Sequence, residues 1–146
     1  MNIVLDGGEH LNIVLDAGAY LPERAHELDA GYDLKSPGFY TVYSHDACTI
    51  DTGVHVEIPE GYVGFLKSKS GLNVKHGITG EGVIDSGYTG SIKVKLYNHS
   101  DFNYDIHKGD KIIQLVLLPI FTPELTVVKE LKSTERNDNG FGSTGK

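Results

Sequence analysis

The sequence predicts an all-β protein, a jelly-roll-like antiparallel β-barrel or sandwich with one short helix and a mobile C-terminal tail. Two observations predict this class. Apolar and polar side chains alternate, so that Val54, Val56 and Ile58 fall on one face of an extended segment and His55 and Glu57 on the other. Turn-forming clusters of Gly, Asp, Asn and Pro recur roughly every ten residues, which is typical of antiparallel strands.

The elements follow from the same patterns. The segment SIKVKLYN repeats the alternation, which indicates a second half-buried strand. Its inward set is Ile92, Val94 and Leu96, and its outward set is Lys93, Lys95 and Tyr97. The segment SGLNVKHG is the only persuasive helix, about two turns long, and Ser70 is placed to cap it.

The chain is expected to form one folded domain. No linker-like composition divides its 146 residues, so we assign residues 1–134 to a β domain and residues 135–146 to a flexible C-terminal lid. Residues 1–10 form an expected N-terminal extension. The pentapeptide NIVLD occurs at residues 2–6 and again at 12–16, which fits either a β-hairpin or a strand preceded by a mobile extension.

Composition excludes several functions. The net charge of −7 argues against binding the backbone of a nucleic acid, which requires a concentrated basic face. The most apolar stretch, 112–121, is interrupted by Gln114 and Pro119 and is too short to span a membrane. The acidic N-terminus does not resemble a signal peptide, and a single cysteine fits a reducing compartment. We therefore expect a soluble, cytoplasmic protein.

Three patterns with the residue types of catalytic sites have simpler interpretations. The letters Ser-His-Asp at 44–46 match a hydrolase triad, but triad members converge in space and are not chain neighbours. The seven histidines lack the short spacing of zinc ligands. Cys48 lies in a strand-like run and is interpreted as a small buried apolar residue.

The segments that do indicate chemistry are loops. Asp33 follows a glycine in AGYDL, and Lys69 and Ser70 precede a glycine that opens the helix, where an anion could bind. Asp85 and Tyr88 lie in a glycine-rich turn between two strands. Each feature alone is common in turns. The ending GFGSTGK matches all but the last letter of a P-loop, yet neither a strand nor a helix flanks it.

Taken in order, these segments resemble the five motifs of the trimeric dUTP diphosphatases. The resemblance runs from about Leu21 to the C-terminus, and its third and fifth motifs are the most specific. The five matching segments are AGYDL (30–34), KSGL (69–72), GVIDSGYTG (82–90), GDKIIQL (109–115) and RNDNGFGSTG (136–145). The family usually has Arg at the position of Lys69, and Lys cannot form the same planar, bidentate contact.

The resemblance implies a role for each matched residue. Asp85 would be the general base that activates water for attack on the α-phosphorus, and Tyr88 would lie under the deoxyribose and exclude a 2′-hydroxyl. Asp33 would hold Mg²⁺ indirectly, through its bound waters. Backbone groups of Gly82, Val83, Ile84 and Lys93 would read the uracil edge. The remaining substrate-binding residues would be Lys69, Ser70, Gly71 and Gln114 along the phosphates, Arg136, Ser143 and Thr144 at the γ-phosphate, and Phe141 with Gly142 over the uracil.

The resemblance also implies an activity and an assembly. The activity is Mg²⁺-dependent hydrolysis of dUTP to dUMP and pyrophosphate, which limits dUTP and supplies dUMP for thymidylate synthesis. The assembly is a homotrimer whose active sites are shared between subunits. Two alternatives stay open at this point: a dCTP deaminase of the same fold, and a nucleotide-responsive regulatory protein that acts on a protein partner.

Overall fold

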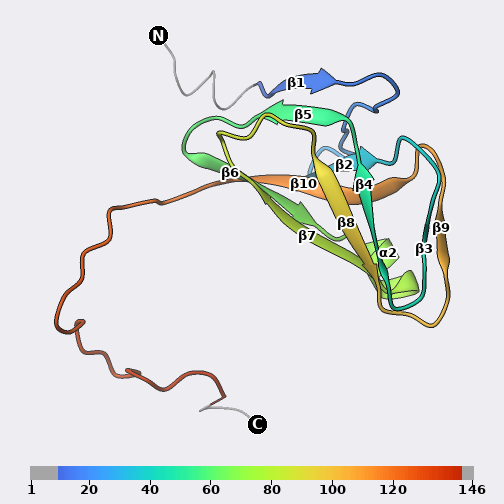
Figure 1. The fold of residues 1–146 in the computed structure, drawn as a ribbon. Helices are drawn as coiled ribbons and strands as arrows, with labels where there is room; N and C mark the ends of the chain where they lie inside the picture. Colours follow the sequence, from blue (N-terminus) through green and yellow to red (C-terminus); the bar gives the residue numbers. More distant parts are fainter. Residues whose placement is uncertain (1–9, 143–146) are drawn as a thin grey trace.

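The computed structural model describes residues 10–142, and in this range the chain forms ten β-strands and one helix (Figure 1). The strands are β1 (Asn12–Leu15), β2 (Gly31–Lys35), β3 (Tyr40–Val42), β4 (Ala47–Asp51), β5 (Val54–Glu57), β6 (Tyr62–Lys67), β7 (Ile78–Ile84), β8 (Lys93–Asn98), β9 (Tyr104–Ile106) and β10 (Lys111–Pro119). The helix is α2 (Ser70–His76). The all-β prediction with one short helix is confirmed for these residues.

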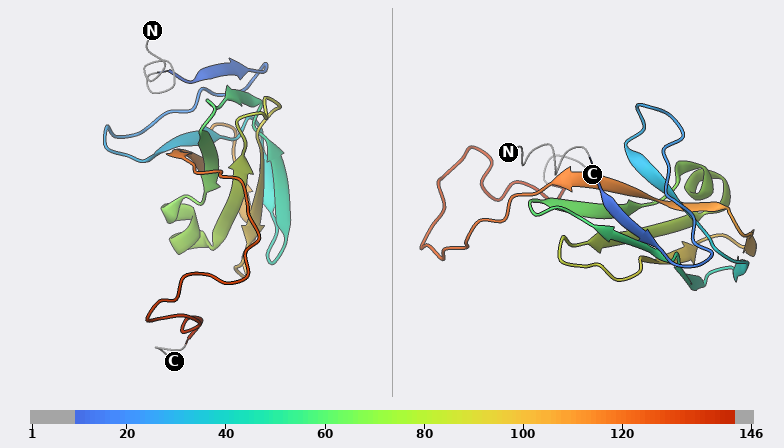
Figure 2. Two further views of the ribbon diagram at one scale, coloured as in Figure 1. Left: turned by 90° about the vertical axis from the view of Figure 1, so that its left-hand side faces the viewer. Right: turned by 90° about the horizontal axis from the view of Figure 1, so that it is seen from above.

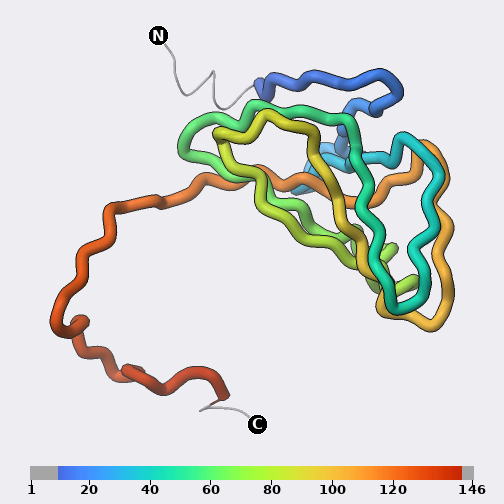
Figure 3. Tube along the Cα trace, in the orientation of Figure 1, coloured from blue at the N-terminus to red at the C-terminus, as the bar shows by residue number. Residues whose placement is uncertain are grey.

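The strands form one large sheet and two small ones, and every pairing between them is antiparallel. The large sheet has the order β2-β10-β6-β7-β8-β4, while β1 pairs with β5 and β3 with β9. In Figure 1 the β1–β5 pair lies along the top of the molecule and the β3–β9 pair along its right side. Figure 3 shows the same arrangement as a Cα trace, with the C-terminal segment leaving the sheets.

The side chains predicted to point inward from the strands form the hydrophobic core. Val54, Val56 and Ile58 are buried, while Glu57 is exposed and His55 is half-buried. Ile92, Val94 and Leu96 are also buried, and strand β8 begins one residue after Ile92. Burial of one face of each strand supplies most of the favourable free energy of folding. The two-residue alternation in the sequence therefore predicts which side chains fill the barrel.

The helix differs from its prediction at its first residue. Lys69, not Ser70, is the N-cap residue, and no side chain caps the helix. The backbone N–H of Asn73 donates to the carbonyl of Lys69 at 2.9 Å, which places Ser70 inside the first turn. Gly77 ends the helix with a φ of 68°, a left-handed conformation that glycine adopts without strain.

Residues after β10 leave the sheets. The backbone N–H of Ile120 donates to the carbonyl of Gly61 at 2.9 Å, and beyond this bond the chain runs away from the barrel (Figures 1 and 2). Phe121, Leu125 and Val127 are almost fully exposed there. The first NIVLD copy and the last four residues lie outside the described range, so the roles predicted for Ser143 and Thr144 lie outside it too.

Candidate active site

The first group of predicted residues gathers where β2, β10 and β6 lie side by side. Asp33 on β2 is opposite Gln114 on β10, and Gln114 is in turn opposite Lys67 at the end of β6. Residues Lys69 and Ser70 follow directly from β6. The predicted motifs around Asp33, Lys69 and Gln114 are therefore brought together by strand pairing, and we call these three residues with Ser70 the phosphate-side group.

Asp33 is the buried charge of this group. Only 5% of its side chain is exposed, and Lys69 Nζ lies 2.5 Å from its Oδ1. Lys111 Nζ lies 3.5 Å from the other carboxylate oxygen, Oδ2. Two ammonium groups compensate one buried carboxylate, so this end of an acidic protein carries local positive charge. Lys111 was not among the predicted residues, because its distance from Asp33 depends on strand register.

Gln114 is held in place by two features of its neighbours. Its Nε2 donates to the carbonyl of Ser68 at 3.0 Å. A Cβ added to Gly31 would lie 2.5 Å from Gln114 Oε1 and 3.0 Å from its Cβ, so only glycine fits beneath this side chain. The polar Gln114 within an apolar strand thus occupies space that the glycine of the first motif leaves open. Gly31 is a second site residue that sequence reasoning did not single out.

The second group lies on β7 and the loop that follows it. Residues 81–84 pair with β6 on one side, but β7 and β8 are paired only from Ile78 with Asn98 to Gly80 with Leu96. Beyond that point the two strands separate. The backbone groups of Gly82 and Ile84 face β6, opposite Leu66 and Gly64, whereas those of Glu81 and Val83 face β8 and have no ladder partner on that strand. Val83 is 62% exposed. Of the residues predicted to read a base, Val83 therefore has backbone groups available to a ligand, while those of Gly82 and Ile84 are turned toward β6.

The loop after β7, residues 85–90, carries the two most specific predicted residues, and we call it the hydrolytic loop. Asp85 and Tyr88 are both exposed. The N–H of Tyr88 donates to the carbonyl of Asp85 at 3.0 Å, and the Tyr88 hydroxyl donates to the carbonyl of Ser91 at 2.7 Å. Lys93, the other predicted residue of this group, opens β8 opposite Asp51.

The two groups lie at opposite ends of strand β6 (Figure 1). Ile84, which precedes Asp85, is paired with Gly64, whereas Lys69 lies five residues beyond Gly64 along the chain. At about 3.3 Å per strand residue this separation is roughly 15–20 Å. One chain therefore does not bring Asp85 next to the phosphate-side group.

The third group lies in the C-terminal segment. Arg136 donates from Nε to the carbonyl of Asn139, and Phe141 is fully exposed with a positive φ of 41°. Gly142 has a φ of 93°, which favours glycine. Figures 1 and 2 show this segment apart from both other groups.

The Ser-His-Asp run at 44–46 and Cys48 make structural contacts. The Ser44 hydroxyl donates to the carbonyl of Ser100 at 2.7 Å, and His45 pairs with Asp101, so the Ser-His-Asp run does not form a triad. Cys48 packs against the core, and burial raises the pKa of its thiol. That environment disfavours the reactive thiolate. No long apolar helix that could cross a membrane occurs in residues 10–142.

The side chains around Asp33 determine how a metal ion could be held there. Among the described residues no cluster of three or more His, Cys, Asp or Glu side chains could hold a metal ion directly. Asp33 is a lone carboxylate, and its Oδ2 has only the distant Lys111 contact. This set fits Mg²⁺ bound mainly by a ligand's phosphates and waters, with one carboxylate oxygen accepting from a metal-bound water.

An exposed carboxylate in a loop, an open backbone edge and two lysines around a buried carboxylate indicate the class of this protein: an antiparallel β-sheet protein with a site for a phosphorylated ligand. Residues 17–145 match the family model described as dUTPase. The chain belongs to the dUTPase family.

The similar proteins agree with this assignment. A deoxyuridine 5′-triphosphate nucleotidohydrolase from Candida albicans is 44% identical over 86% of this chain and 81% of its own length. The enzyme of the same name from Paramecium bursaria Chlorella virus 1 is also 44% identical, over 87% and 91%.

Solved structures show the same fold. The dUTPase of Staphylococcus bacteriophage 80alpha, solved with dUpNHpp, has a TM-score of 0.88 at 37% identity and covers 94% of this chain and 99% of that one. A mutant dUTPase from phage phi11 of S. aureus, which reveals the coordination of a structural Mg(II) ion, has a TM-score of 0.77 at 36% identity, over 83% and 97%.

Proposed function

We propose that the protein hydrolyses dUTP to dUMP and pyrophosphate, with Asp85 as the general base. Membership of the dUTPase family supports the activity. The observation that carries the assignment to this site is the position of Asp85, one residue after the open backbone edge of β7. A base and a surface that could read a nucleobase are thereby adjacent. The deaminase and purely regulatory alternatives are not favoured by the similar proteins.

The second group performs recognition and proton transfer. Backbone groups of Val83, and of Lys93 at the start of β8, hydrogen-bond the uracil edge, and the donor–acceptor pattern excludes cytosine without a charged side chain. Tyr88 packs under the deoxyribose. The Asp85 carboxylate accepts a proton from the attacking water, so that the nucleophile reaches the α-phosphorus as developing hydroxide.

The phosphate-side group holds the leaving pyrophosphate. Lys69, Ser70, Gly71 and Gln114 contact the phosphate chain, and Asp33 would help to hold Mg²⁺ indirectly, through water. Mg²⁺, when bound, neutralises phosphate charge that would otherwise repel the carboxylate of Asp85. The C-terminal segment then closes the site, with Arg136, Ser143 and Thr144 on the γ-phosphate and Phe141 with Gly142 over the base.

The roles proposed for the two groups of residues require more than one chain. The β-phosphorus is joined to the α-phosphorus through a single oxygen, so the phosphate contacts must lie within a few ångströms of Asp85. Within one chain, Asp85 and Lys69 are at opposite ends of β6. A homotrimer with shared active sites removes this difficulty, because one subunit supplies the hydrolytic loop and a neighbour supplies the phosphate-side group.

Pyrophosphate release tests the function directly. The purified protein is assayed with dUTP, dTTP, dCTP and UTP, each with Mg²⁺ and with EDTA. We expect turnover of dUTP that EDTA abolishes and much slower turnover of the other three. Equal rates on all four nucleotides, or none on dUTP, would contradict the proposal, and release of ammonia from dCTP would favour a deaminase. Sedimentation of the same sample reports whether the active species is a trimer.

A further inference from the structure

The two ends of the hydrolytic loop differ in the hydrogen bonds that connect them to the rest of the barrel. At its start the Asp85–Tyr88 turn has its internal backbone bond at 3.0 Å, and the Tyr88 hydroxyl donates to the carbonyl of Ser91 at 2.7 Å. Just past its end, the N–H of Ile92 donates to the carbonyl of Val54 at 2.8 Å, and the Ser91 hydroxyl donates to Asp51. Between these points the one side chain from outside the loop that contacts its carbonyl groups, within the described residues, is His55.

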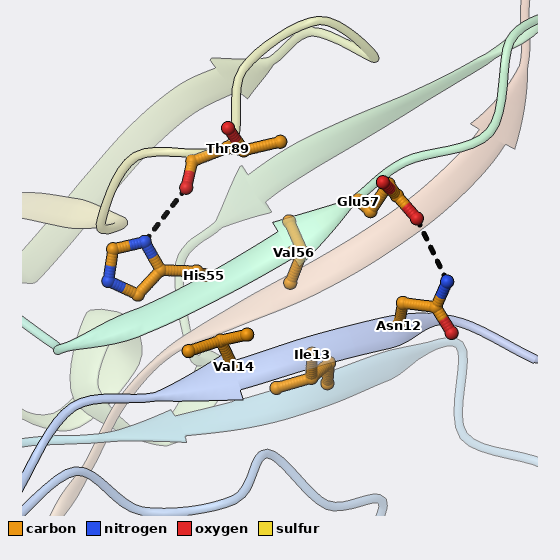
Figure 4. Close-up of a pocket in the computed structure, with 7 residues that line it drawn as sticks. All are labelled: Asn12, Ile13, Val14, His55, Val56, Glu57 and Thr89. Carbon is orange, nitrogen blue, oxygen red and sulfur yellow. Dashed lines mark hydrogen bonds between the residues drawn. The ribbon is translucent and has the colours of Figure 1, made fainter.

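His55 projects from β5 toward the loop, as Figure 4 shows, and its Nδ1 lies 2.8 Å from the carbonyl oxygen of Thr89. Thr89 immediately follows Tyr88. On the other side of the ring, Nε2 lies 3.0 Å from Oδ1 of Asp16. The N–H of Asp16 donates to the carbonyl of Gly53 at 2.9 Å, so this carboxylate is itself held against the turn before β5.

Both partners of the ring can only accept hydrogen bonds. A backbone carbonyl and an ionised carboxylate carry no proton, so each needs an N–H from the imidazole. The neutral ring has one N–H and therefore satisfies one partner, whereas the imidazolium ring satisfies both. The pairing geometry thus selects the doubly protonated form of His55.

The charges around the ring favour the same form. The hydrogen bond to Thr89 and then that to Asp16 raise the pKa of His55, and the nearby charge of Asp51 on β4 adds to this. Lys93 on β8 acts on Asp51. On β1, the residue opposite His55 is the apolar Val14. A raised folded-state pKa means that the two-sided contact is present at lower pH and is lost as pH rises through that pKa.

We propose that His55 is a positioning residue: by donating to Thr89 and Asp16 together it fixes the end of the hydrolytic loop that carries Tyr88, and through the turn, Asp85. This inference rests on the proposed dUTP hydrolysis. Above the pKa of His55 two neutral tautomers compete. One leaves the Thr89 carbonyl without a donor, and the other turns a nitrogen lone pair toward Asp16.

The kinetic test compares His55→Gln with a matched control. Gln can donate to one acceptor and does not titrate. The control is His45→Gln, because His45 forms the same kind of pair with Asp101 at 2.8 Å but does not touch the loop. kcat and KM for dUTP are measured between about pH 6 and pH 9 for the complete protein. For His55→Gln we expect kcat at neutral pH to fall by about 10-fold, since small misplacement of a base is costly, with a smaller change in KM.

The pH profile separates positioning from general destabilisation. The wild-type protein and His45→Gln should share a decline in kcat at high pH that His55→Gln lacks. In Asp16→Asn the amide can donate to neutral Nε2, so Nδ1 keeps its proton for Thr89 and the decline should become weaker. A His55→Gln variant with the wild-type kcat and profile would overturn the proposal.

Nitrogen-15 NMR of the histidine rings gives a readout independent of turnover. The resonances of His55 are assigned by their absence in His55→Gln. Both ring nitrogens should stay protonated to a pH above the ordinary pKa of histidine, because the hydrogen bonds to Thr89 and Asp16 raise the pKa of His55. A His55 ring that loses its second proton at or below the ordinary pKa of histidine would sink the inference even if dUTP is hydrolysed. Absent turnover with a ring that stays protonated beyond that pKa would instead count against the proposed function.

Discussion

The ammonium group of Lys69 lies 2.5 Å from Oδ1 of Asp33, and this pair joins the end of β6 to the middle of β2. The carboxylate is almost fully buried, while the Lys69 side chain is 28% exposed. Lys111 approaches the same carboxylate from β10, but at 3.5 Å and with 40% of its side chain exposed. The two lysines therefore differ in how much each compensates one buried charge.

This difference predicts unequal effects on stability. Lys69→Met should lower the free energy of unfolding by about 1–3 kcal/mol, because Asp33 loses its closest partner while staying buried. Lys111→Met should cost less than about 1 kcal/mol, as expected for a more exposed pair. Urea unfolding at one fixed protein concentration measures both. Equal losses for the two variants would show that Asp33 does not depend on Lys69.

Gly31→Ala is expected to displace the side chain of Gln114. The new Cβ would lie 2.5 Å from Gln114 Oε1, so the side chain must leave the Ser68 carbonyl, at a cost of about 1–3 kcal/mol. The double variant Gly31→Ala/Gln114→Ala removes the closest clash, that with Oε1, but leaves two Cβ atoms 3.0 Å apart, so it should recover part of the stability but not the activity. Thermal unfolding and dUTP turnover of the two variants decide this. No recovery in the double variant would place the strain elsewhere.

Asp85→Asn tests the base. The amide keeps the size of the side chain but cannot accept a proton from water, so kcat should fall by about 10²–10⁴. Affinity for a nonhydrolysable dUTP analogue should change little, since Asp85 is not expected to hold the nucleotide. Single-turnover kinetics and calorimetry measure the two quantities. Turnover near the wild-type rate would remove Asp85 from this role.

Ending the chain after Thr134 tests the predicted lid. The deleted residues that the structure describes are almost all exposed and bury no core, so the unfolding temperature should stay nearly unchanged. kcat should fall by more than about 10²-fold, because Arg136 and the exclusion of water are lost together. Phe141→Ala should have a milder effect. A shortened chain with the full rate would mean that the near-P-loop ending is not a lid.

Sequence patterns predict the fold because side-chain alternation is local. Val54, Val56 and Leu96 are buried as expected from a period of two residues. Register between distant strands is not local. The approach of Lys111 to Asp33, and the space that Gly31 leaves for Gln114, depend on which residues pair across β2 and β10. The predicted Ser70 cap is wrong by one residue, since helix starts depend on a single backbone bond.

The arrangement of the candidate site is equally hard to predict from the sequence. The five motifs identify the residue types for phosphate, sugar and base, yet no property of the separate motifs reveals how far apart they fold. His55 illustrates what is missed: its partners Asp16 and Thr89 lie in different segments, and its neighbours in the sequence carry no catalytic signal. Only the folded chain brings a carbonyl and a carboxylate to the two sides of one ring.

The distance between Asp85 and Lys69 along β6 has a genetic consequence. Two defective alleles can complement each other, one carrying Asp85→Asn and the other Gln114→Ala. If the protein is the proposed homotrimer with shared sites, about a quarter of the sites in randomly mixed trimers would combine an intact loop from one allele with an intact phosphate-side group from the other. Refolding the two inactive proteins together should therefore restore a measurable fraction of wild-type turnover, while mixing them without subunit exchange should restore none.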